Sequence, residues 1–221
     1  MFRHFQDRTE AGRALAHGLS RFRGHTDAVV IALPRGGVPV GFEVARELGL
    51  PLDVCVVRKL GVPGQEELAF GAIASGGAHV INEGVVVQLG LPAELVERVI
   101  AKERIELKRR ESLYRQFQAS IHLAGKTVLL VDDGLATGAT MRAAIKSVKQ
   151  QGAKFVIVAI PVAPCDTCKL LAQEADDVLC LVEPENFTSV GLWYGSFPQV
   201  TGDQVRLMLQ RAPWATTVAS L

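Results

Sequence analysis

One short segment constrains this chain more than any other: residues 128–140, with the sequence VLLVDDGLATGAT. Its apolar start is typical of a buried strand (127–131), which ends at two adjacent acids, Asp132 and Asp133. A loop of small residues and hydroxyls follows and leads into a helix predicted over 139–151. In open α/β sheets, ligands bind at the carboxyl ends of the strands. The segment therefore predicts a ligand site at that edge of a sheet.

The loop after the acids is suited to a terminal phosphate. Small residues let backbone N–H groups approach an anion closely, and the helix N-terminus adds partial positive charge. Thr137 and Thr140 can add hydroxyl donors. The loop is not a Walker A motif, because no G-K-[ST] sequence follows, and it lacks the G-x-G-x-x-G spacing of dinucleotide sites. A dinucleotide is therefore not expected.

The two carboxylates indicate what the phosphate is attached to. Carboxylates repel phosphate, so they are expected to contact another part of the ligand, and vicinal hydroxyls suit paired acceptors. A phosphate and a diol a short distance apart describe ribose 5-phosphate. The plainer alternative is that Asp132 and Asp133 cap a turn within an ordinary strand-to-helix connection.

Short apolar runs alternate with amphipathic segments along the rest of the chain. Strands are predicted at 28–33, 52–60, 127–131, 154–163 and 177–182, with short strands at 70–74 and 79–82. Helices are predicted at about 7–22, 42–50, 92–117, 139–151, 165–175 and 201–212. This alternation predicts an α/β fold with a mostly parallel central sheet flanked by helices.

Charge and hydropathy exclude several classes of function. The net charge of +1 gives no electrostatic footprint for nucleic acid or an anionic membrane. No apolar run reaches the roughly 18 residues that span a bilayer, and the first residues lack the apolar region of a signal peptide. A cytoplasmic protein with no nucleic-acid or membrane partner is expected.

Residues 128–140 resemble the signature of type I phosphoribosyltransferases, in which a strand, two acids and a small-residue phosphate loop follow one another. A bacterial subgroup of predicted phosphoribosyltransferases is similar over nearly the whole chain, through PRGG (34–37), RKLG (58–61), VDDG (131–134) and VGLWYGSF (190–197). The resemblance implies one domain over 1–221, with an insertion at about 83–120 and a C-terminal hood at about 183–200.

The activity implied by this resemblance is the transfer of ribose 5-phosphate from phosphoribosyl pyrophosphate (PRPP) to an acceptor, with release of pyrophosphate. The implied acceptor is a nucleobase or related heterocycle. A regulatory protein that senses PRPP or nucleotides on the same fold is the alternative. A homodimer is expected by analogy alone.

The resemblance assigns the 5-phosphate to the loop residues Gly134, Ala136, Thr137, Gly138, Ala139 and Thr140. Asp132 and Asp133 would hold the ribose hydroxyls, directly or through Mg²⁺, which is the implied cofactor. Their negative charge would stabilise the positive charge that develops on the ribose as pyrophosphate leaves. As a hard ion, Mg²⁺ would be held mainly by substrate oxygens and keep several waters.

Pyrophosphate is assigned to two further motifs, through Arg35, Gly36, Gly37, Arg58 and Lys59. Arg35 and Lys59 join the two acids as the implied catalytic residues. The first motif, 33–41, is implied to be the pyrophosphate loop, and the second, 57–72, a flexible lid that excludes water. The alternatives are an ordinary turn after a strand and a solvated basic loop.

Aromatic residues crowd the predicted hood. Phe187, Trp193 and Tyr194 are assigned to the acceptor, because stacking on an aromatic ring favours a flat heterocycle. Phe197 lies in the same loop. The alternative is that these rings fill a small core beneath the loop.

The charged helix predicted to end near Phe117 departs from the compact purine enzymes. Leu95, Val99 and Leu113 suggest a thin apolar stripe. Its arginines could reach toward phosphate or a second subunit, or the helix could simply be solvated; they are Arg104, Arg109, Arg110 and Arg115.

Overall fold

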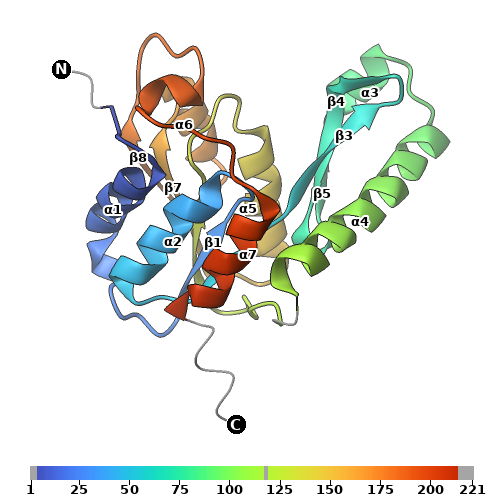
Figure 1. Cartoon of the computed structure of the whole chain (residues 1–221). Coiled ribbons are helices and arrows are strands. Elements are labelled where there is room, and N and C mark those ends of the chain that lie inside the picture. The colour runs from blue at the N-terminus through green and yellow to red at the C-terminus, as the bar shows by residue number, and fades with distance from the viewer. Residues whose placement is uncertain (1–3, 117–118, 214–221) are drawn as a thin grey trace.

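A parallel sheet of five strands, in the order β2-β1-β6-β7-β8, lies at the centre of the computed structural model, which describes residues 4–116 and 119–213 (Figure 1). Its strands are β1 (Ala28–Ala32), β2 (Leu52–Val54), β6 (Thr127–Val131), β7 (Phe155–Val162) and β8 (Asp177–Val182). Each neighbouring pair runs parallel. The predicted α/β architecture is confirmed.

Both faces of this sheet are buried under helices, which explains why its strands are continuous apolar runs. Leu129 and Val131 of β6 face one layer, and Val128 and Leu130 face the other. The first layer holds α1 (Arg8–Gly18), α2 (Gly37–Leu48) and α7 (Gly202–Arg211). The second holds α5 (Ala139–Gln150) and α6 (Cys165–Leu171).

A lobe stands beside the core and carries its own antiparallel sheet, β3-β4-β5 (Figure 1). Its elements are β3 (Val57–Val62), β4 (Gln65–Ala74), β5 (His79–Ile81), α3 (Glu83–Gln88) and α4 (Ala93–Arg115). Leu60 and Phe70 of the hairpin pack with Ile100 and Leu107 of α4. The lobe therefore contains the β3–β4 hairpin as well as most of the insertion expected at about 83–120.

One prediction on this part of the chain was wrong: the predicted strand 52–60 is two strands, β2 and β3, which belong to different sheets. The apolar run continues between β2 and β3 because Cys55 packs in the core of the main sheet and Val56 in the core of the lobe. No polar residue therefore marks the boundary between the two strands. The segment 57–72, predicted to be a flexible lid, forms a hairpin in which β3 pairs with β4 over most of its length.

Several helices differ from the expectation: α1 ends at Gly18 and α6 at Leu171, each earlier than predicted. Helix α2 begins at Gly37 rather than at 42, since the N–H of Gly37 already donates to the carbonyl of Leu33. Helix α4 ends at Arg115, and the expected terminus at Phe117 lies outside the described residues. Its apolar face consists of Val99, Ile100 and Leu107, whereas Leu113 is exposed.

Arg115 joins the end of α4 to the core, instead of projecting toward phosphate, a second subunit or solvent. Its Nε lies 2.9 Å from Oδ1 of the buried Asp53, and its Nη2 donates to the carbonyl of Val54 at 2.9 Å. The lobe is therefore fixed to β2 where the helix returns to the core.

Three single turns complete the described chain: η1 (Ser20–Phe22), η2 (Ser75–Gly77) and η3 (Val190–Trp193). The last belongs to the hood, which packs on the N-terminal segment, because Phe5 pairs with Tyr194. Within 4–116 and 119–213, no helix has both the length and the apolar character needed to cross a membrane.

Candidate active site

The loop between β6 and α5 has the geometry that anion binding requires. Gly138 precedes α5 with a left-handed φ of 71°, and a Cβ there would lie 3.0 Å from Cγ2 of Thr167. The Thr167 hydroxyl donates to the carbonyl of Ala136 at 2.6 Å and so ties the loop to α6. Thr137 and Ala139 are exposed. Because the first-turn N–H groups of a helix have no partner within it, α5 offers them to an anion.

Asp132 and Asp133 lie side by side where β6 ends. The N–H of Asp133 donates to Oδ1 of Asp132 at 2.8 Å. The Tyr194 hydroxyl donates to the carbonyl of Asp133 at 2.5 Å, which ties the acids to the hood. Arg8 of α1 holds the carboxylate of Asp133, with Nε and Nη2 each 2.8 Å from Oδ2. The acid pair is thus fixed from two sides.

The segment 33–41, predicted to be the pyrophosphate loop, lies directly against the acids. A Cβ on Gly36 would lie 2.0 Å from Oδ2 of Asp133, and one on Gly37 would lie 2.8 Å from Cα of Asp132. The Pro34–Arg35 peptide bond is cis. Only residues without a side chain allow this approach, so the structure brings the two predicted motifs together although about a hundred residues separate them in the sequence.

A cavity of about 550 Å³ opens between these motifs and the hood. The predicted residues Arg35, Gly36, Asp132 and Asp133 line it, together with Arg8 and the hood residues Val190, Phe197, Pro198, Gln199 and Val200. Both acids therefore lie at the wall of this cavity, where each is partly buried.

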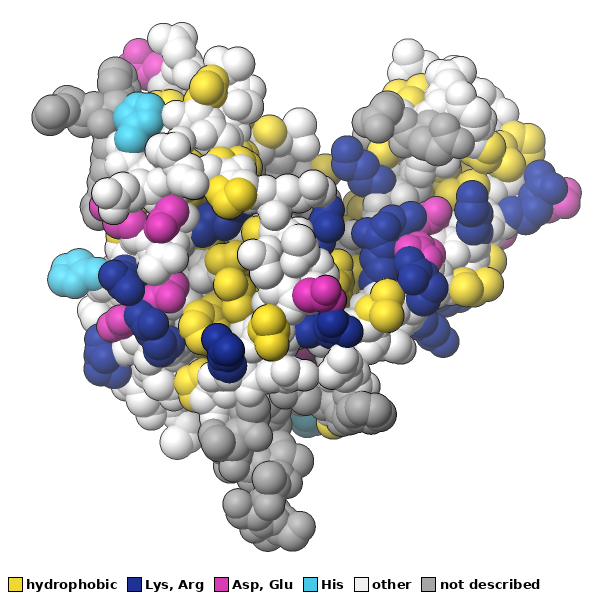
Figure 2. Space-filling view, viewed as in Figure 1, with side chains coloured by type: hydrophobic (Ala, Val, Ile, Leu, Met, Phe, Trp, Pro, Cys, Tyr) yellow, Lys and Arg dark blue, Asp and Glu magenta, His cyan; other side chains and the backbone are white. Residues whose placement is uncertain are grey.

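Arg58 and Lys59 line a different cavity, of about 690 Å³, between the lobe and the core. Thr140 of the phosphate loop lines it too. Arg58 is paired with Glu103 of α4, with Nε 2.7 Å from Oε2, whereas Lys59 is exposed. Figure 2 shows lysine and arginine side chains gathered along this cleft. The structure thus brings Lys59 toward the 5-phosphate loop and not into the cavity of the acid pair.

The three aromatics assigned to the acceptor are placed mainly in a small core. Trp193 and Tyr194 are buried with Phe5, and Phe187 is half-buried against this group. Phe197, which was not assigned to the acceptor, lines the acid-pair cavity instead. The sequence alone does not show which of these rings faces the site, because all of them lie in one loop interrupted by glycines.

Arg8 is the site residue that the sequence did not reveal. Besides Asp133, it donates through Nη1 to the carbonyl of Pro198 at 2.8 Å, and its guanidinium lies 3.7 Å from the centre of the Phe197 ring. An arginine in the first turn of an amphipathic helix does not indicate a site residue in the sequence, since its partner Asp133 lies 125 residues away.

Removing the Arg8 side chain should destabilise the fold. The Arg8→Ala variant leaves a largely buried Asp133 carboxylate without its cation, and such a loss typically costs about 3–5 kcal/mol. Urea unfolding measures the change. Arg13→Ala on the same helix is the matched control: Arg13 is 58% exposed in its pair with Glu43, so its loss should cost no more than about 1 kcal/mol. Equal losses in the two variants would contradict the assignment.

Asp132 makes stability depend on pH. Burial and the neighbouring charge of Asp133 raise the pKa of the Asp132 carboxyl well above its usual range. The folded protein then binds this proton more tightly than the unfolded chain, so the free energy of unfolding falls as pH rises from the ordinary aspartate pKa through the raised one. Asp132→Asn removes this loss.

The Asp132→Asn variant should therefore unfold at a higher temperature than the wild type, by about 2–4 °C for each kcal/mol gained. The difference should grow as pH rises above the ordinary aspartate pKa, measured by thermal circular dichroism with EDTA present. Equal unfolding temperatures of the two proteins, or a difference between them that shrinks as pH rises, would contradict the raised pKa of Asp132.

Cys165 and Cys168, the two cysteines of the sequence CDTC at the start of α6, differ in exposure. Cys165 is exposed, while Cys168 is buried. The ligand atoms of Cys168, Cys180 and Glu183 lie within 4.8 Å of one another. The thiol of Cys168 therefore faces β8 rather than its sequence neighbour.

Comparisons with known proteins agree with this geometry. A family model described as the phosphoribosyl transferase domain matches residues 5–192. "Putative phosphoribosyl transferase Rv0571c" of Mycobacterium tuberculosis is 48% identical over 208 residues, which are 94% of this chain and 47% of that protein. The chain thus spans about half the length of this curated relative. An adenine phosphoribosyltransferase of Mycoplasmopsis agalactiae is 34% identical over 94 residues, 42% of this chain and 54% of that protein.

A solved structure is similar to this chain over nearly its whole length. The crystal structure of TT1426 from Thermus thermophilus is 41% identical, with a TM-score of 0.82, and the match covers 95% of this chain and 99% of that one. The phosphate loop, acid pair and pyrophosphate loop described above lie within the residues that the family model matches. The chain therefore belongs to the phosphoribosyl transferase family.

Proposed function

We propose that this chain transfers ribose 5-phosphate from PRPP to a nucleobase or related heterocycle and releases pyrophosphate. One observation carries the proposal. The two acids after β6 lie in contact distance of the Gly36–Gly37 turn, share a cavity with it, and are followed directly by the loop that precedes α5. A sugar over the acids would thus have an anion site on either side.

The proposed roles follow from how charge develops during the reaction. As pyrophosphate leaves, positive charge grows on C1 and the ring oxygen of the ribose, and a fixed carboxylate nearby stabilises it. Asp132 and Asp133 supply that charge, and the Arg8 contact keeps Asp133 from turning away. Arg35 and the backbone of the pyrophosphate loop receive the leaving group, while the amides of residues 136–140 hold the 5-phosphate.

The residues at the cavity are compatible with Mg²⁺. Asp132 and Asp133 present carboxylate oxygens to it, the ligand type that this ion prefers. Bound there with substrate, Mg²⁺ would neutralise the departing pyrophosphate. Asp133 already shares Oδ2 with Arg8, so we propose that substrate oxygens and waters complete most of the coordination.

A screen of purine and pyrimidine bases tests the proposal, with PRPP and Mg²⁺ present and pyrophosphate release as the readout. Purines come first, since an adenine phosphoribosyltransferase is among the relatives. Release that requires both a base and Mg²⁺ is expected. The absence of PRPP binding, measured by calorimetry, would refute the function. The regulatory alternative has no support from the relatives named above, and we do not propose it.

A further inference from the structure

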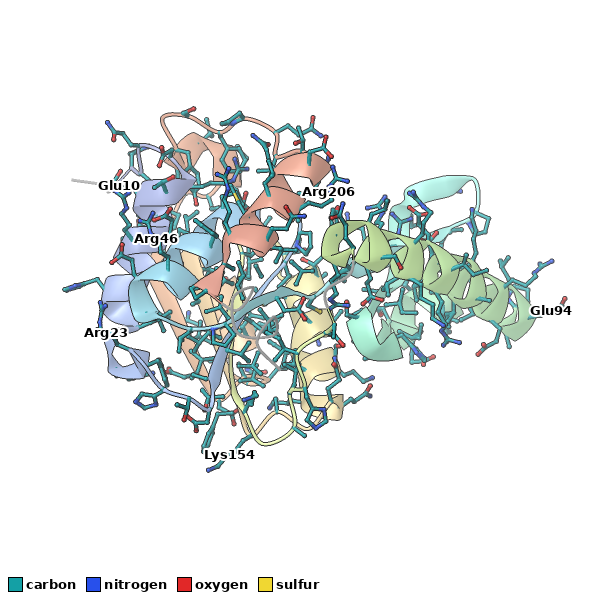
Figure 3. All side chains as sticks on the ribbon, turned by 60° about the horizontal axis from the view of Figure 1, so that its bottom comes forward. Glu10, Arg23, Arg46, Glu94, Lys154 and Arg206 are labelled. Carbon is teal, nitrogen blue, oxygen red and sulfur yellow. The ribbon has the colours of Figure 1, made fainter. Side chains whose placement is uncertain are left out.

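A third cavity, of about 320 Å³, lies where the lobe meets the core. Four arginines line it: Arg35 of the pyrophosphate loop, Arg109 and Arg110 of α4, and Arg206 of α7. Figure 3 shows α4 running from Glu94 at the far tip of the lobe back to the core, where α7 carries Arg206. The cavity therefore exists only because α4 returns to the core beside α7.

The charge of this cavity is strongly positive. Two carboxylates face its arginines: Glu106 accepts from Nε of Arg109 at 2.7 Å and of Arg110 at 3.0 Å, and Asp203 pairs with Arg206. Four guanidinium groups against two carboxylates leave an excess of two positive charges. The whole chain has a net charge of only +1, so this excess is a local concentration.

The arginines keep donors free for a ligand. Each guanidinium carries five N–H groups, and Arg110 uses only Nε in its contact with Glu106. Arg35 is exposed, and its side chain forms no hydrogen bond or ion pair with any residue that the structure describes. Planar guanidinium groups with spare N–H donors match phosphate oxygens in both geometry and charge.

Arg35 connects this cavity to the acid pair. The same residue lines the 320 Å³ cavity and the cavity that holds Asp132 and Asp133. A ligand with its sugar over the acids could therefore place an anionic group beyond Arg35, between α4 and α7. None of the predicted pyrophosphate residues other than Arg35 belongs to this set of four.

We propose that Arg109, Arg110 and Arg206, together with Arg35, form a binding subsite for a phosphate or pyrophosphate group of the substrate that occupies the acid-pair cavity. The subsite rests on the proposed function for the identity of that substrate, but its affinity for phosphate does not. The group can belong to the donor, as the pyrophosphate of PRPP, or to a phosphorylated acceptor.

The first test is calorimetric titration of inorganic pyrophosphate into the wild type and the Arg109→Gln, Arg110→Gln double variant at one ionic strength. We expect the Kd for pyrophosphate to rise about tenfold or more in the variant, while the Kd for ribose 5-phosphate stays within about twofold. Arg109 and Arg110 are 61% and 40% exposed, so the fold should persist, which circular dichroism checks.

The matched control removes the same charge from the same helix. Arg104 and Lys108 are exposed residues of α4 that do not line the cavity. Arg104→Gln with Lys108→Gln should leave the pyrophosphate affinity within about twofold. An equal loss of pyrophosphate affinity in both double variants would mean that only the long-range charge of the helix matters, and it would overturn the subsite. Wild-type protein that binds no pyrophosphate would overturn it as well.

Substitution of Glu106 should raise the affinity for pyrophosphate, whereas loss of the arginines should lower it. Hydrogen bonds from Arg109 and Arg110 lower the pKa of Glu106 to about 2, so its carboxylate competes with a ligand for them at neutral pH. Glu106→Gln should bind pyrophosphate several-fold more tightly than the wild type. Weaker binding would contradict the subsite.

Titration of PRPP distinguishes the two sources of the phosphate. If the subsite holds the donor's pyrophosphate, the Arg109→Gln, Arg110→Gln variant should lose PRPP affinity by the factor found for free pyrophosphate. If PRPP affinity is unchanged while pyrophosphate binding falls, the subsite serves the acceptor. Arginine-dependent binding of pyrophosphate in a protein that binds no PRPP would refute the proposed function and leave the subsite standing.

Discussion

The Asp132→Asn, Asp133→Asn double variant is expected to lose PRPP turnover by roughly 10²–10³-fold or more while remaining folded. The amides keep the shape of the carboxyl groups and can still accept hydrogen bonds, but they lack the negative charge that opposes the positive charge growing on the ribose. Pyrophosphate release under saturating PRPP measures the loss. Ribose 5-phosphate titration should still show binding, because residues 136–140 are untouched.

A control with the same chemical change separates charge at the site from charge in general. Asp27 and Asp166 are 60% and 97% exposed, and neither lines the acid-pair cavity. Asp27→Asn with Asp166→Asn removes two carboxylates as well and should retain turnover within about twofold. Substantial activity in the Asp132, Asp133 variant would refute the role of the acids, whatever the control does.

The parts of the site that the sequence predicted well are contiguous. Strand β6, the two acids and the start of α5 follow one another within residues 127–139, so local patterning was sufficient to predict them. A buried strand needs a continuous apolar run, and a phosphate-binding turn needs small residues. Each requirement can therefore be recognised from consecutive residues in the sequence. The capping box of α7, Thr201 with Gln204, was predictable for the same reason.

The parts that the sequence did not predict depend on contacts between distant segments. Arg8 reaches Asp133, and Arg109 and Arg206 share one cavity, but no pattern near any of them encodes its partner. The apolar face of α4 was misassigned because Leu113 fits a helical stripe as well as Leu107 does. Leu107 is buried because it packs with Leu60 and Phe70 of the β3–β4 hairpin, a contact between segments far apart in the sequence.

Placing a methyl group on Gly36 should disable the site almost as completely as removing the acids. The new Cβ of Gly36→Ala would lie 2.0 Å from Oδ2 of Asp133, far inside van der Waals contact. That oxygen cannot move freely, because Nε and Nη2 of Arg8 each hold it at 2.8 Å. Either the pyrophosphate loop or Asp133 must shift, and a displacement of about 1 Å in a catalytic group can cost 10²-fold in rate.

We therefore expect Gly36→Ala to lower PRPP turnover by about 10²-fold and the free energy of unfolding by about 1–3 kcal/mol, as overpacking of a close contact typically does. Gly84→Ala is the matched control, since its Cβ would meet nothing nearer than Oδ1 of Asn82 at 3.3 Å, within helix α3. That variant should keep full activity and change the free energy of unfolding by no more than about 1 kcal/mol, the size of the helix preference for alanine over glycine. Unchanged turnover in Gly36→Ala would mean that the two motifs do not act on one ligand, since the acids and the loop could then separate without consequence.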